Sequence, residues 1–204
     1  MQPGRLKDAN DVDDATLVAQ VKMGNMWAME ALYHRYVHKV TGISAKLLRN
    51  GPDIEDVVQD TFIEAFRDMV QLREPHHVER WLVRIAIHRA HRRFRRRKLK
   101  RTLGLDRSID DECLADQART DASQEARAEI ALLDSVFDSM RLAERTCYVL
   151  RCLEGYHLDE VAQMTGCSLA TVKRRVSRAQ QMVAIHFPLR SRYREPNNTE
   201  IAAE

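Results

Sequence analysis

Apolar residues recur at helical spacing along most of the chain, and the alternation typical of strands is nearly absent. Ile54, Val57, Val58, Phe62 and Met69, for example, fall on a single helical stripe. The pattern predicts helices over about residues 14–23, 26–48, 53–69, from 78 into a basic tract, 125–140, 147–154, 158–164 and 169–186. We therefore expect an all-α protein.

Residues 103–124 interrupt this pattern with a polar, acidic stretch that has no period. Such a composition is typical of a flexible linker. It predicts two helical domains, at residues 12–102 and 125–187, followed by a disordered tail at 188–204. Hydrophobic residues make up 44% of the 204 residues, which is enough for two small cores.

Charge is strongly segregated, although the net charge is only +3. Between Trp81 and Leu105 there are ten lysines and arginines and no acidic residue. So dense a tract is self-repelling unless a polyanion neutralises it, and such contacts give salt-sensitive binding to nucleic acid. The alternative from the residues alone is a non-specific basic arm.

The segment "YHLDEVAQMTGCSLATVKRRVSRAQ", which ends at Gln180, has the spacing of a helix-turn-helix. Gly166 suits the tight turn, Ser168 is a suitable N-cap, and Val172 and Val176 form an inner face. The second helix of such a motif enters the major groove, where its first residues read bases. A helical hairpin with a solvated basic face is the alternative.

The helix from Asp53 has an acidic outer face. Asp56, Asp60 and Glu64 lie one turn apart, and each like-charge pair costs a few tenths of a kcal/mol. We expect Asp53 to be the N-cap. A basic protein partner would relieve the repulsion, and a simply solvated face is the alternative.

Several classes of protein are not expected. The four cysteines, 113, 147, 152 and 167, form no CxxC pair, so neither a zinc site nor a disulfide framework is predicted. No nucleophile–base set or phosphate loop points to an enzyme, a cofactor or a small-molecule substrate. No stretch reaches the roughly 18 apolar residues of a membrane span, and no signal peptide is visible, so we expect a cytoplasmic protein.

Four segments together resemble the extracytoplasmic-function group of bacterial sigma-70 factors. "DDATLVAQVKMGNMWAMEALYHRY", "DIEDVVQDTFIEAFRD" and "WLVRIAIHRAHRRFRRR" are similar to parts of sigma region 2. "LAERTCYVLRCLEGYHLDEVAQMTGCSLATVKRRVSRAQ" is similar to region 4. The resemblance implies a factor that binds core RNA polymerase and promoter DNA, that recognises −10 and −35 elements, and that an anti-sigma factor restrains.

The resemblance also implies roles for particular residues. Binding to core polymerase falls on Asp56, Gln59, Asp60 and Glu64. Contact with the −35 element falls on Ser168, Thr171, Lys173, Arg174, Arg175 and Arg178. Contact with the −10 element falls on Arg73, Glu74, His76, His77, Arg84, His88, Arg89, Arg92, Arg93 and Arg96.

Three positions depart from the family's pattern. Arg174 stands where the family often has Ser, so the −35 preference is expected to be altered. His88 stands where the family usually has Asn, and Arg92 stands where it often has a carboxylate or an amide, so the −10 preference is expected to differ. Two other functions are compatible with the residues. One is a stand-alone helix-turn-helix regulator that binds DNA as a dimer, and the other is an RNA-binding or scaffold protein that uses the basic tract alone.

Overall fold

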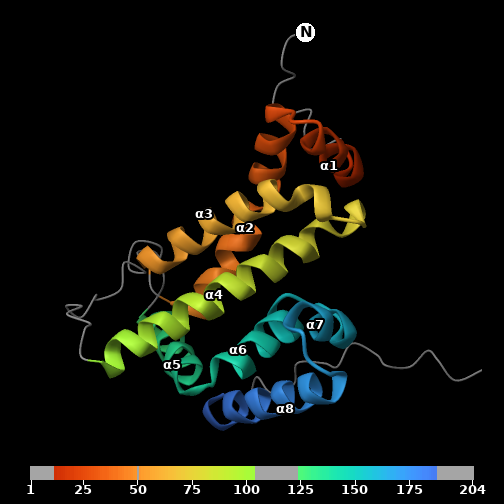
Figure 1. Cartoon of the computed structure of the whole chain (residues 1–204). Coiled ribbons are helices and arrows are strands. Elements are labelled where there is room, and N and C mark those ends of the chain that lie inside the picture. The colour runs from red at the N-terminus through yellow and green to blue at the C-terminus, as the bar shows by residue number, and fades with distance from the viewer. Residues whose placement is uncertain (1–11, 50, 104–123, 188–204) are drawn as a thin grey trace, which may run out of the picture. The chain divides into compact units, whose positions relative to one another are not determined.

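The structure, a computed structural model, describes residues 12–49, 51–103 and 124–187 (Figure 1). Every regular element in these ranges is helical, which confirms the all-α prediction. The elements fall into two compact units, one mainly before residue 121 and one mainly after it. The predicted linker and tail lie almost wholly outside the described residues.

The first unit contains α1 (Asp14–Lys22), α2 (Met26–Leu48), α3 (Gly51–Asp68) and α4 (Val78–Thr102). Short 3-10 turns, η2 (Met69–Gln71) and η3 (Pro75–His77), connect α3 to α4. Asp13 caps α1 by accepting from the backbone N–H of Thr16 at 2.8 Å. Asn25 caps α2 in the same way, so the chain turns at the predicted break after Met23.

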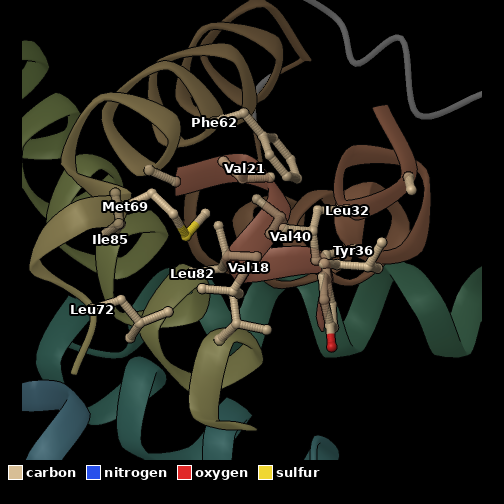
Figure 2. Close-up of a cluster of buried hydrophobic side chains, with 14 of the residues drawn as sticks. Val18, Val21, Leu32, Tyr36, Val40, Phe62, Met69, Leu72, Leu82 and Ile85 are labelled. Carbon is tan, nitrogen blue, oxygen red and sulfur yellow. The ribbon is translucent and has the colours of Figure 1, made fainter. Parts of the chain in front are cut away.

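Apolar side chains from all four helices fill one core in this unit (Figure 2). Leu17, Val18 and Leu32 from the first two helices are almost fully buried, as are Met69 and Leu82 further along the chain. Trp27 and Trp81 pack against the same cluster and are partly buried. The predicted apolar stripes therefore meet in this core.

Helix α4 lies beside α3 over much of its length (Figure 1). Helix α3 begins at Gly51, so the expectation that Asp53 is its N-cap is wrong. Asp53 instead lies in the first turn, where it is buried. Its side chain accepts a hydrogen bond from Arg93 on α4.

The second unit contains α5 (Gln124–Ser139), α6 (Leu142–Tyr148), the π-helical turn η5 (Val149–Leu153), α7 (Leu158–Thr165) and α8 (Leu169–His186). Gly155 follows η5 with φ of +80°, a conformation that glycine adopts without strain. Val136, Phe137, Met140 and Tyr148 form a core with Ala179 of α8. No described helix has the length and apolar character needed to cross a bilayer.

Candidate nucleic-acid interfaces

The turn between α7 and α8 has the geometry of a helix-turn-helix. Gly166 adopts φ of +64°, and Cys167 donates its backbone N–H to the carbonyl of Ala162 at 3.1 Å. Ser168 then caps α8 by accepting from the N–H of Thr171 at 3.3 Å. Val172 and Val176 are buried, so the opposite side of α8 faces outward. These features confirm the predicted turn, cap and inner face.

The cations of α8 differ in their surroundings. Lys173 and Arg174 are exposed, and neither forms an ion pair within the described part of the chain. Arg175 is half-buried and donates to Sγ of Cys167 at 2.9 Å. Arg178 lies 3.6 Å from Glu144 on α6. Lys173 and Arg174 are therefore the cations of this predicted −35 set whose side chains form neither an ion pair nor a hydrogen bond with another described residue.

Two further members of the predicted −35 set, Ser168 and Thr171, lie at the N-terminus of α8. Thr171 is half-buried, and its hydroxyl lies 2.9 Å from that of Ser168. Both side chains are close to the backbone N–H groups of the first turn of α8. In a recognition helix, the residues of this turn are expected to face a phosphate or a base edge. Leu169, exposed at the first helical position, was not predicted from the sequence.

Acidic residues of α3 and arginines of α4 form a row of ion pairs, which we call the α3–α4 ion-pair row. Arg93 bonds Asp53 at 2.5 Å through Nε and Asp56 at 2.6 Å through Nη2. Arg89 pairs with Glu64 and lies 3.4 Å from Asp60. The row comprises Asp53, Asp56, Asp60, Glu64, Arg89, Arg93 and Arg97.

This row changes the interpretation of both charged helices. The like-charge repulsion along α3 needs no external partner, because Arg89 and Arg93 of the same chain relieve it. The side chains of Asp56 and Asp60 nevertheless remain 53% and 57% exposed, so a partner can still reach them. Gln59 is also exposed, whereas Glu64 is only 29% exposed.

The predicted −10 residues of α4 fall into two groups. Arg89 and Arg93 belong to the α3–α4 ion-pair row. The others are exposed and form no ion pair with any residue of the described ranges; they are Arg84, His88, Arg92 and Arg96. Arg95 shares this exposed, unpaired state but was missed, although its helical spacing from Arg92 and His88 would have indicated it.

His88 is the one neutral member of this exposed group at pH 7. Partial burial and the neighbouring charge of Arg84 lower its pKa below the usual value, with a smaller contribution from Arg95 and an opposing one from Glu64. A neutral imidazole has one donor and one acceptor nitrogen and a flat ring. Such a side chain is suited to a base as well as to a phosphate.

The loop before α4 packs against α1, and its charged and histidine side chains are exposed. Leu72 is buried, and its carbonyl accepts from Nζ of Lys22 at 2.8 Å. His77 lies 2.6 Å from Glu74 through Nδ1 and Oε2. The four predicted loop residues are all exposed: Arg73, Glu74, His76 and His77.

The cysteines of the second unit include no metal site. Among the residues that the structure describes, no group of three or more cysteine, histidine, aspartate and glutamate side chains could hold an ion. Cys147 is buried, and this burial raises the pKa of its thiol. It is therefore protonated at neutral pH and packs as a small apolar side chain.

Comparison with known proteins defines the class to which these helices belong. Residues 32–100 match the family Sigma-70 region 2, and residues 130–182 match the family Sigma-70, region 4. The ECF RNA polymerase sigma-E factor of Haemophilus influenzae is 30% identical over 188 residues, which cover 86% of this chain and 95% of that protein. The RNA polymerase sigma-H factor of Pseudomonas aeruginosa is 28% identical, over 83% of this chain and 91% of its own.

Solved structures with low sequence identity share the fold. The structure of CnrH in complex with the cytosolic domain of CnrY aligns with a TM-score of 0.63 at 23% identity, over 86% of this chain and 97% of that chain. The sigma factor RpoE of Bartonella quintana, solved with the anti-sigma factor NepR, aligns with a TM-score of 0.60 at 18% identity, over 79% and 97%.

The two units thus define a two-domain transcription initiation factor. The chain belongs to the extracytoplasmic-function group of the sigma-70 family. It is a sigma factor that directs transcription to promoters, as the sequence predicted.

Proposed function

We propose that the separate surfaces described above divide the work of promoter recognition. The exposed cations at the start of α8 read the −35 element, and α4 with the loop before it binds the −10 element. The observation that carries this assignment is that Lys173 and Arg174 are unpaired on the outer side of a capped helix-turn-helix helix. Early residues of such a helix are those that reach base edges.

Domain boundaries follow from the same proposal. Residues 12–102 hold region 2, residues 125–187 hold region 4, and residues 103–124 connect them. The two family matches, at 32–100 and 130–182, support this division.

The outer carboxylates of α3 dock on core RNA polymerase in this proposal. Asp56 and Asp60 are more than half exposed, and each also touches an arginine of α4 that holds it in place. Gln59 lies between them on the exposed side. A basic surface of the polymerase is the expected counterpart, since complementary charge speeds and orients association.

An anti-sigma factor is the further partner that we propose. Support comes from the Bartonella quintana sigma factor, which was solved with one. The chain performs no chemistry itself, requires no cofactor and acts in the cytoplasm, because its partners are the polymerase and the promoter.

Co-elution with core polymerase tests the proposal against a stand-alone regulator. The purified chain is mixed with core enzyme lacking sigma factors and passed over a sizing column. The proposal predicts a stoichiometric complex, and addition of a housekeeping sigma factor should displace the chain. A chain that elutes alone, and as a dimer, would favour the stand-alone regulator.

A further inference from the structure

The exposed cations of α4 follow the helix on one side. Arg84, His88, Arg92 and Arg95 are spaced by four, four and three residues, which places them on a single stripe. We call this stripe the open row. The effect of Arg84 and Arg95 on the pKa of His88 is consistent with this placement.

The arginines of the α3–α4 ion-pair row follow a different stripe of the same helix. Arg89, Arg93 and Arg97 are each four residues apart, and all three point to α3. At about 100° per residue, Arg93 lies roughly 100° or more around the helix from Arg92 and Arg95. The basic tract of α4 therefore has one side that pairs with α3 and another side that is exposed and unpaired among the described residues.

Arg89 and Arg93 each contact two carboxylates of α3. Arg93 bonds the nearly buried Asp53, whose side chain is 12% exposed, and also the exposed Asp56. Arg89 has the same arrangement with Glu64 and Asp60. A phosphate that recruited either arginine would leave an inner carboxylate without its closest partner, which costs more than a lost surface pair.

No such cost applies to the open row. Arg92 and Arg95 are exposed and form no ion pair in the described part of the chain, so a phosphate displaces only water and counterions. We propose that nucleic acid binds α4 along the open row, that Arg95 contacts its phosphates, and that Arg89, Arg93 and Arg97 only hold α3. The inference rests on the proposed function of α4 and names the side of the helix that performs it.

The test is the salt dependence of DNA binding by the free, full-length chain. The probe is a fluorescent single-stranded oligonucleotide of twenty thymidines, and its anisotropy gives Kd from 50 to 300 mM KCl. Each phosphate contact on a single strand contributes about 0.7 to the slope of log K against log salt. Arg95→Gln and Arg93→Gln are matched, because they remove the same charge from the same helix.

We expect Arg95→Gln to lower the slope by about 0.7 and to weaken binding several-fold at 100 mM KCl. Arg93→Gln should leave the slope unchanged and lower the unfolding midpoint of the first unit instead. Where Arg93→Gln does not fold, Arg97→Gln gives the same comparison, since Arg97 lies 3.7 Å from Asp53.

Three results would overturn the inference. They are an unchanged slope for Arg95→Gln, an equal loss of slope for the ion-pair-row variant, and no binding of the wild-type chain at 50 mM KCl. Failure of the proposed function is a separate outcome: a chain that binds the oligonucleotide with the expected slopes but never forms a complex with core polymerase contradicts that function alone.

Discussion

Arg93 on α4 donates from Nε to Oδ1 of Asp53 on α3 at 2.5 Å, and this bond joins the basic tract to the first turn of the acidic helix. The same guanidinium bonds Asp56 at 2.6 Å. One arginine thus links an inner, nearly buried carboxylate to an outer one that faces solvent. These carboxylates of α3 are therefore paired within the chain before any partner binds.

Arg93→Ala should destabilise the first unit by about 1–2 kcal/mol, because Asp53 is left nearly buried without its closest partner. Trp27 and Trp81 are the chain's two tryptophans and both pack on the core of this unit. Urea unfolding followed by tryptophan fluorescence therefore reports on this unit alone. Arg92→Ala is the control and should lie within about 0.5 kcal/mol of wild type. Equal midpoints for the two variants would show that the bond adds no stability.

Reversing Asp56 and Asp60 to Lys should abolish binding to core polymerase while the fold persists. The change removes two exposed negative charges and adds two positive ones on the proposed docking face. Surface plasmon resonance with immobilised core enzyme gives the affinity, and circular dichroism checks the helices. Glu55→Lys is the matched control, since Glu55 is exposed on α3 and forms no ion pair with another described residue. Unchanged binding by the double variant would remove this face from the polymerase interface.

Arg174→Ala should reduce transcription by an amount that depends on the promoter, since a good base contact contributes about 1–3 kcal/mol of discrimination. Arg175→Ala is the neighbouring control. Its guanidinium is already engaged by Cys167, so any loss should be similar on every promoter. Multiplexed transcription over a set of promoter variants measures both. A uniform loss for Arg174→Ala would argue that it does not read a base.

Binding of the thymidine oligonucleotide should strengthen through His88 as the pH falls below the usual range of histidine pKa values. Its pKa is lowered by burial and by Arg84, so the imidazole is neutral at pH 7 and gains a charge only as the pH falls through that lowered value. The added charge on the imidazole attracts phosphate. The carboxylate of Glu64 partly favours the protonated imidazole. His88→Asn should lose this part of the pH profile while keeping the contribution of the other histidines. Superimposable profiles for wild type and His88→Asn would contradict the prediction.

The sequence was sufficient to predict the helices and the turn before α8. Periodicity revealed the buried stripes because each helix has one apolar side, and Ser168 and Gly166 satisfy local requirements of capping and turning that depend only on nearby residues. Such local signals need no knowledge of tertiary contacts.

The pairing of α3 with α4 could not be predicted in the same way. Arg92 and Arg93 are adjacent and identical in type, and only the position of α3 decides that Arg93 bonds Asp53 while Arg92 remains exposed. The ten cations of the tract were expected to lack internal counter-charges, yet Asp56 and Glu64 supply them from more than 20 residues away. Arg95 was missed although its spacing of three residues from Arg92 places both on one side of α4.

Mapping the 5′ ends of transcripts made in vitro tests the central claim most directly. The purified chain is mixed with core RNA polymerase freed of sigma factors and with a genomic fragment library, and the 5′ ends of the products are sequenced. The account predicts starts at a limited set of sites that share two upstream elements, with Arg174→Ala altering the element farther from the start and Arg92→Ala the nearer one. Products no more abundant or more localised than those of core enzyme alone would contradict it.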